Sequence, residues 1–153
     1  MTGAVKMKTT VTLRAAAKGS SHSRTDVSIR DVSATVDEPE ARGGTNAGPA
    51  PTETALAALA GCTNVIANKV AHKMRVDLGR LEIDITCSFD RRGVTFAEEI
   101  DVPFVDLTQT IIAHGSLSEE ALAAVGVDVA KYCPLSKLFE SAGTKLTTTW
   151  RKP

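Results

Sequence analysis

The feature that most constrains the fold is a long helical pattern over residues 52–74. Its apolar side chains recur at steps of three and four residues, which is the period of one face of an α-helix. These side chains are Leu59, Cys62, Ile66 and Val70. Thr52 is the expected N-cap, Pro51 stands just before it, and the charge of Glu53 suits the positive end of the helix. We therefore expect a core helix that carries a cysteine on its buried face.

Segments on both sides of this helix have the pattern of strands. Residues 8–36 are rich in Thr and Val and partly alternate, with residues 18–23 as turn material. Residues 81–87 alternate strictly between apolar and polar side chains. Residues 96–115 read as one long bent strand or two short ones, with Pro103 at an edge or a bulge. We thus expect β-structure both before and after the helix.

The last third of the chain predicts two more helices and a final strand. The first of them has Ser116 or Ser118 as its cap, followed by two acidic residues. Its apolar positions are Leu122, Val125 and Val129, and the next step of four reaches Cys133. Pro134 then breaks or restarts the helix, residues 136–143 form a short helix, and residues 145–151 form a strand. The predicted fold class is α+β.

Composition limits the classes of function. The chain has 153 residues, a length that fits one domain or a domain completed by oligomerisation. Eighteen basic residues balance eighteen acidic ones, which argues against nucleic acid or an anionic membrane as a partner. No apolar run approaches the ~20 residues of a membrane span, and the N-terminus lacks a secretory pattern. We therefore expect a cytoplasmic protein. Aromatic residues make up only 4%, so an aliphatic core is expected, one that a partner subunit could help to complete.

Three cysteines, Cys62, Cys87 and Cys133, lie far apart in the sequence. They form neither a CxxC pair nor a zinc-finger spacing, and the histidines are scattered, so no metal site is expected. An odd number of cysteines in a cytoplasmic chain argues against a disulfide framework. They are therefore either packed core thiols or reactive ones. Because two helices each place a cysteine on a core-facing stripe, Cys62 and Cys133 are candidates for a pair, and Cys87 is expected to be core.

Two segments resemble motifs of the OsmC/Ohr family, the osmotically inducible and organic-hydroperoxide-resistance proteins. Residues 37–63, DEPEARGGTNAGPAPTETALAALAGCT, resemble the family's glycine loop that runs into a cysteine-bearing helix. Residues 132–139, YCPLSKLF, resemble its second motif, a Cys-Pro pair. The resemblance is closer to the broader OsmC-like branch. It implies a single OsmC-like domain over residues 1–153, with an antiparallel β-sheet wrapped around long central helices in an intertwined homodimer.

The resemblance also implies a function. It makes the chain a thiol-dependent peroxidase that reduces organic hydroperoxides and hydrogen peroxide, with Cys62 as the peroxidatic and Cys133 as the resolving cysteine. No cofactor is implied, only an external dithiol reductant. The family further uses a glutamate and an N-terminal arginine at the site. Carried over, these are Glu53 and Arg24, with three competitors for the arginine, which are Arg14, Arg30 and Arg42.

The chemistry explains why such residues are needed. A thiol attacks peroxide only as the thiolate, and burial opposes ionisation, so a nearby cation is required. Glu53 stands nine residues before Cys62, on the opposite face of a regular helix, so it would act through a partner subunit or an unwound first turn. An apolar lining would favour an organic peroxide over hydrogen peroxide. The expected lining residues are Leu56, Leu59, Ile66, Leu135 and Phe139.

Two other classes of function remain open. The chain could be a non-enzymatic protein of the same fold that binds a small apolar ligand or senses redox state, with slowly reacting thiols. It could also be a structural or interaction protein whose cysteines only fill the core. In the last case, substitution of Cys62 or Cys133 would change stability alone.

Overall fold

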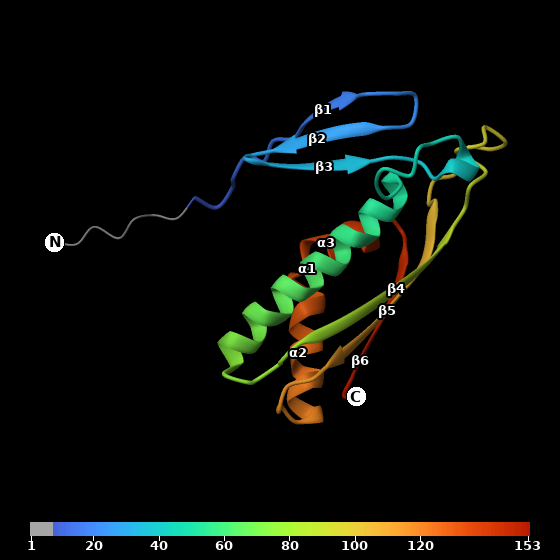
Figure 1. The fold of residues 1–153 in the computed structure, drawn as a ribbon. Coiled ribbons are helices and arrows are strands. Elements are labelled where there is room, and N and C mark those ends of the chain that lie inside the picture. Colours follow the sequence, from blue (N-terminus) through green and yellow to red (C-terminus); the bar gives the residue numbers. More distant parts are fainter. Residues whose placement is uncertain (1–7) are drawn as a thin grey trace. The chain divides into compact units, whose positions relative to one another are not determined.

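The computed structural model describes residues 8–153, which divide between Thr54 and Ala55 into two compact units (Figure 1). The α+β class predicted from the sequence is confirmed, since the described residues form two small sheets and three α-helices. That the whole chain makes one domain stays a prediction.

The first unit holds an antiparallel three-stranded sheet in the order β1-β2-β3. Its strands are β1 (Ala16–Gly19), β2 (Thr25–Ile29) and β3 (Val32–Val36). The expected β-structure is thus confirmed, but the first strand is shorter than the Thr- and Val-rich pattern indicated. A short 3₁₀ helix, η1 (Glu40–Arg42), interrupts the loop that follows β3.

A buried carboxylate organises that loop. Asp37 accepts hydrogen bonds from the backbone N–H groups of Glu38, Thr45 and Ala47, at 2.8, 3.0 and 3.1 Å. The Thr45 hydroxyl donates a fourth, at 2.6 Å, and is the main reason that the pKa of Asp37 lies well below its usual range. The loop also passes close to β3, since a Cβ added to Gly48 would stand 2.1 Å from the Thr35 carbonyl oxygen. Hydrogen bonds to one ion therefore fix the course of the loop.

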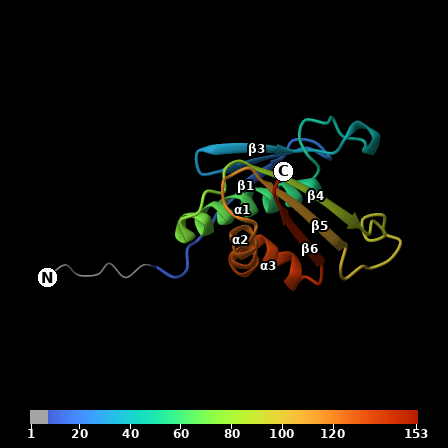
Figure 2. The same cartoon turned by 90° about the horizontal axis from the view of Figure 1, so that it is seen from below.

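The second unit is built from the remaining helices and strands. They are α1 (Pro51–Met74), which begins in the first unit, β4 (Leu81–Phe89), β5 (Phe104–Ala113), α2 (Glu119–Tyr132), α3 (Pro134–Ser141) and β6 (Lys145–Arg151). The three helices lie on one face of the sheet β4-β5-β6 (Figure 1, Figure 2). No helix within residues 8–153 combines the length and the apolar character that crossing a membrane requires.

The second sheet is mixed, so the expectation of an antiparallel sheet is wrong here. Strands β4 and β5 pair antiparallel, whereas β5 and β6 pair parallel. The chain leaves β5, passes through α2 and α3, and returns as β6, and such a helical crossover is what brings a strand back parallel. The outcome follows from the two helices between the strands.

The start of α1 differs from the sequence-based expectation. The helix begins at Pro51, so the preceding residue Ala50 occupies the cap position and Thr52 lies within the first turn. The backbone N–H of Ala50 donates to the Glu53 carboxylate at 2.8 Å. Proline is favoured at the first helical position because its missing N–H would have had no partner in the helix. The Glu53 side chain, instead of a Thr52 hydroxyl, thus satisfies the backbone at this end.

The buried stripe of α1 is also turned by about one residue. Its buried side chains are Leu59, Thr63, Ala67, Val70 and Ala71. Cys62 and Ile66, which we expected on the stripe, are half-buried at its border. The alanines of α1 explain the difference. Because their side chains are small, the helix can pack against the sheet on a face that the spacing of its larger apolar residues did not predict.

The elements that follow agree more closely with the sequence. Ser118 caps α2 by accepting the N–H of Ala121, so the second of the two expected serines is the cap. The stripe of α2 is buried as predicted and continues to Cys133, which is fully buried. Residues 96–103, however, form a loop instead of strand, because Asp90 donates its N–H to the Pro103 carbonyl and so closes the loop just before β5 begins.

Two helical glycines provide a matched test of the packing in this unit. A Cβ on Gly126 of α2 would come within 2.7 Å of the Trp150 ring, whereas one on Gly61 of α1 meets nothing within 4 Å. Gly126→Ala is therefore expected to destabilise the protein, by about 1–3 kcal/mol from overpacking. Gly61→Ala should stabilise it by about 0.5–1 kcal/mol through helix propensity. Urea unfolding monitored by circular dichroism measures both, and equal effects would contradict the packing described.

The Asp37 cage predicts a pH-dependent stability. Because the pKa of Asp37 is lower in the folded state than the value of about 4 in an unfolded chain, its contribution is complete above pH ~4 and is lost as the pH falls further. Asp37→Asn should therefore lower the thermal midpoint at pH 7, and the difference from the wild type should shrink below pH ~4. Asp31→Asn, at an exposed turn position, is the control. A difference that stays constant down to pH 3 would contradict this assignment.

Candidate functional site

The structure brings Cys62 and Cys133 together. Cys62 lies on α1, and Cys133 stands between α2 and α3, where it ends the first helix and precedes the second. Cys62 packs against the core cluster that contains Cys133, and Cys133 is near enough to affect the pKa of the Cys62 thiol. Cys133 is fully buried, whereas Cys62 is half-buried. Of the two thiols, Cys62 is therefore the one that a molecule from outside can reach. One accessible sulfur therefore has a second, covered sulfur directly beside it.

Burial raises the pKa of the Cys62 thiol above its ordinary value. The neighbouring Cys133 raises the same pKa, because a second sulfur nearby favours the neutral thiol over the thiolate. Two groups act in the other direction, namely the backbone N–H of Leu135 and the positive charge of Lys69. The contributions that favour the neutral thiol prevail, so within this unit Cys62 is held mainly protonated.

The contact with Leu135 was missed by the sequence analysis, which sought only a cation. Leu135 is the second residue of α3, and backbone N–H groups in a first helical turn have no partner within the helix. The Leu135 N–H lowers the pKa of the Cys62 thiol, in the direction opposite to the effect of burial. The signal was present in the sequence, because a Pro directly after Cys133 is typical of a helix start. Lys69 was detectable as well, since it follows Cys62 by two helical turns.

An apolar pocket of about 240 Å³ lies beside α3 and the start of β5. Its lining residues are Ala55, Val102, Pro103, Phe104, Leu138, Phe139, Ala142 and Thr144. Ala55 precedes Cys62 by two turns on the same face of α1, and Leu138 and Phe139 belong to the helix that starts after Cys133. The pocket and the thiol pair therefore lie along the same pair of helices.

Of the five residues expected to line a substrate site, only Phe139 borders this pocket. Leu59 is fully buried in the core. Leu56, Ile66 and Leu135 are half-buried and pack against the core. Cys87 lies on the inward face of β4, and burial raises the pKa of its thiol. Within residues 8–153 no group of His, Cys, Asp and Glu side chains gathers as metal ligands would.

The structure does not bring Glu53 to Cys62. Both lie on the continuous helix α1, nine residues apart, which corresponds to roughly 13 Å along the axis and to opposite faces. Glu53 instead caps the helix through Ala50. Arg24 donates to Asp26 through Nε at 3.1 Å and Nη2 at 2.9 Å, so its charge is already paired within the first unit. Arg42 is likewise paired, with Glu38.

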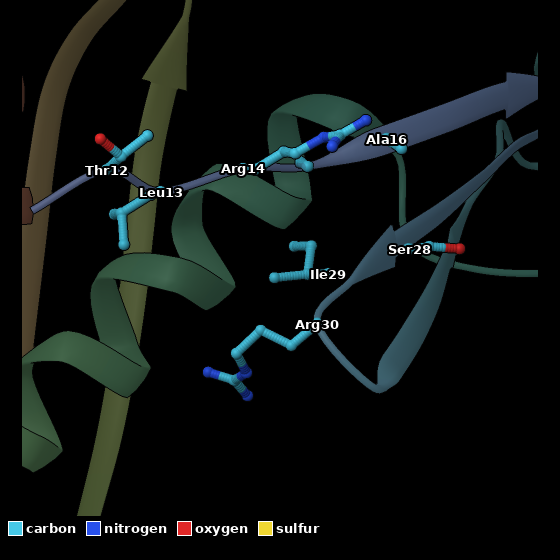
Figure 3. A pocket seen from close by; sticks show the side chains of 8 residues that line it. Thr12, Leu13, Arg14, Ala16, Ser28, Ile29 and Arg30 are labelled. Carbon is cyan, nitrogen blue, oxygen red and sulfur yellow. The ribbon is translucent and has the colours of Figure 1, made fainter.

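Two of the competing arginines are differently placed. Arg14 and Arg30 border an open pocket in the first unit, together with the apolar side chains of Leu13 and Ile29 (Figure 3). Neither forms an ion pair with a carboxylate among residues 8–153. Arg30 also adopts a left-handed φ of 56° at the turn between β2 and β3. Of the four candidate arginines, Arg24 and Arg42 thus form ion pairs among the described residues, whereas Arg14 and Arg30 do not.

Comparison with known families matches the model described as OsmC-like protein over residues 44–149, well over half of the chain. The chain belongs to the OsmC family. The match includes both cysteines of the pair, the last part of the loop before α1 and the helix start after Cys133. The family expectation drawn from the two sequence motifs is thus confirmed.

Solved structures share this OsmC-like fold over nearly their whole length. An OsmC-like protein from Mycoplasma pneumoniae is 19% identical, with a TM-score of 0.78 and coverage of 93% of this chain and 97% of that one. An organic hydroperoxide resistance protein OsmC from Legionella pneumophila is 18% identical, with a TM-score of 0.69 and coverage of 94% and 98%. OhrB of Bacillus subtilis, an organic hydroperoxide resistance protein, is 16% identical, with a TM-score of 0.63 and coverage of 92% and 98%. No curated protein sequence matches the chain significantly.

The contact between the two sulfurs predicts how Cys62 titrates. Its alkylation by iodoacetamide, followed by peptide mass mapping, should rise with pH around a midpoint above the ordinary thiol value of about 8.5. Cys133→Ala removes a neighbour that raises the pKa of Cys62, so the midpoint should move to lower pH. Cys87→Ala should leave it unchanged. A wild-type midpoint at or below that of an ordinary thiol would contradict the environment described here.

Proposed function

We propose that this OsmC family member is a thiol peroxidase that reduces organic hydroperoxides through Cys62 and Cys133. The observation that carries the proposal is the contact between an accessible and a buried sulfur. The family match and the names of two structural relatives, both organic hydroperoxide resistance proteins, support it. A disulfide between the two cysteines requires Cα atoms within about 7 Å, a condition with which this contact is consistent.

The proposed reaction needs two steps and no cofactor. The Cys62 thiolate attacks one peroxide oxygen, an S–O bond forms as the O–O bond breaks, and the departing oxygen leaves as an alcohol after taking up a proton. Cys62 is then a sulfenic acid. The Cys133 thiol gives up its proton and attacks this sulfur, the S–O bond breaks, and the departing hydroxide takes up that proton and leaves as water while a disulfide forms. An external dithiol reduces the disulfide and returns both thiols, so that two electrons from the dithiol balance the reduction of one peroxide.

Formation of the Cys62 thiolate is the step that most needs assistance. The raised pKa leaves little thiolate at neutral pH, and the Leu135 amide and Lys69 offset this only in part. We propose that a guanidinium completes the site and that Arg14 or Arg30 supplies it in preference to Arg24, since Asp26 already holds Arg24. A positive charge at the sulfur would stabilise the thiolate and polarise the peroxide oxygens.

The apolar pocket beside α3 is the proposed site for the organic group of the peroxide. Its volume of about 240 Å³ lies below the usual range for drug-sized ligands, so it suits one small alkyl or aryl group. Phe139 is the expected substrate contact that borders it. A homodimer and a cytoplasmic location belong to the same proposal, because a partner subunit could supply the missing cation and cytoplasmic dithiols could regenerate the thiols.

A redox sensor of the same fold is the second candidate. The observation that favours it is the raised pKa of Cys62, because a mainly neutral thiol reacts slowly. Such a protein would form the same disulfide without rapid turnover. The two functions therefore differ in rate and not in the bond that forms.

Steady-state consumption of cumene hydroperoxide in the presence of a dithiol separates these functions. The wild type should consume the peroxide catalytically, and Cys62→Ser should abolish consumption. Cys133→Ser should permit a single turnover that leaves a sulfenic acid on Cys62, which a dimedone adduct detects by mass. Cys87→Ser, which changes a thiol outside the pair, should retain wild-type activity.

The arginine assignment has its own test in the same assay. Arg14→Gln or Arg30→Gln should lower the rate by roughly 100-fold, the usual scale for loss of one charge-stabilising donor, whereas Arg24→Gln should have a much smaller effect. Peroxide consumption by the wild type no faster than by Cys62→Ser would overturn the peroxidase proposal. Oxidation of the pair without turnover would favour the redox sensor.

A further inference from the structure

A polar side-chain ladder crosses the core next to the candidate site. The Thr63 hydroxyl on α1 donates to the Gln109 Oε1 at 2.9 Å, and the Gln109 Nε2 donates to the Thr148 hydroxyl at 3.4 Å. Thr63 has no exposed surface and Gln109 is 1% exposed. The ladder therefore connects the cysteine-bearing helix to the middle strand β5 and the edge strand β6.

The surroundings of this ladder are apolar. On the buried stripe of α1, Thr63 lies between Leu59 and Ala67. On the inner face of β5, Gln109 lies between Leu107 and Ile111. A buried carboxamide costs free energy unless its polar atoms are paired, and hydrophobic residues of similar volume would fill the same space. The hydrophobic effect therefore does not explain why a polar pair occupies this place in the core.

The fully buried contacts of α1 specify its rotation about its own axis only weakly. Apart from Leu59 and Val70, its fully buried side chains are Thr and Ala, and larger ones such as Ile66 pack only at the border of the core. Apolar contacts are not directional, and small side chains present few knobs to the sheet. A hydrogen bond is directional, so the Thr63–Gln109 bond fixes both the rotation of the helix and its position along β5.

Cys62 is the residue directly before Thr63, so this restraint acts on its sulfur. A rotation of α1 by about 20° would move a sulfur that lies roughly 5 Å from the helix axis by about 2 Å. Disulfide formation tolerates little such movement, because the sulfurs must reach 2.05 Å with Cβ atoms about 3.5–4.5 Å apart. The pairing of Cys62 with Cys133 is therefore sensitive to the same bond.

We propose that Thr63 and Gln109 are positioning residues, whose buried hydrogen bond holds Cys62 in the orientation that allows a disulfide with Cys133. The inference rests on the proposed function only in treating these cysteines as a redox pair. Neither residue touches substrate; both act through the placement of one sulfur. The ladder then selects one orientation of α1 relative to the sheet, which is one role that buried polar pairs serve.

The test is the redox equilibrium of the full-length protein with glutathione, read by alkylation of free thiols and peptide mass mapping. One glutathione disulfide yields two glutathione thiols as Cys62 and Cys133 become one disulfide. Thr63→Val should shift the equilibrium constant against the protein disulfide by roughly tenfold or more, since misplacement on the ångström scale has effects of that size. Thr63→Ser retains the hydroxyl and should keep the wild-type constant.

The decisive variant is the double substitution Thr63→Val with Gln109→Met. With both partners apolar, no buried polar group is left unpaired, so the unfolding midpoint should return toward that of the wild type. The equilibrium constant should nevertheless stay low, because the directional bond is still absent. A purely structural ladder would restore both quantities.

Three results overturn the proposal. They are a wild-type constant in the double variant, a low constant in Thr63→Ser, and failure of the wild type to form the Cys62–Cys133 disulfide at all. Only the last also removes the resolving role proposed for Cys133. Conversely, a wild type that forms the disulfide with glutathione but consumes no peroxide would end the peroxidase proposal and leave the positioning role intact, because this equilibrium involves no peroxide.

Discussion

The packing of α1 against the junction between α2 and α3 determines what this chain can do chemically. It places Cys62 beside Cys133 and beside the first free backbone N–H groups of α3. The core that supports this contact is almost entirely aliphatic, with Leu59, Val125 and Val129 around the helices. Aliphatic packing brings the elements together, but the placement of one sulfur against another depends on the directional bonds around it.

The electrostatics of the site are the result of opposing effects. Desolvation and the second sulfur favour a neutral Cys62 thiol, whereas one amide and one distant ammonium favour the thiolate. A buried thiol that is too easily ionised would be exposed to unwanted oxidation, and one that is never ionised would be inert. Within the second unit alone, the raised pKa keeps Cys62 mainly in its neutral, unreactive form. An additional cation near the sulfur would move the balance toward the thiolate.

The sequence predicted where helices and strands lie better than it predicted which side of each element is buried. Local sequence signals located α1 and the stripe that leads to Cys133, and they narrowed the cap of α2 to Ser116 or Ser118, because these features depend on local spacing. They misplaced the buried face of α1, since a helix rich in alanine can pack in more than one rotation. The parallel pairing of β6 was also missed, because strand direction depends on a long-range crossover. The site was predictable as two cysteines, but not the Leu135 amide or the Gln109 ladder, which join residues distant in the sequence.

The most direct measurement of the central claim is intact mass and peptide mapping of the reduced protein after one equivalent of cumene hydroperoxide. The account predicts a rapid loss of two thiols and a linked peptide that contains Cys62 and Cys133, with Cys87 still reduced. Both thiols remaining reduced, or oxidation of Cys62 only under a large excess of peroxide, would contradict it. In that event the contact between the two sulfurs would be packing, and the apolar pocket would be the place to look for a ligand.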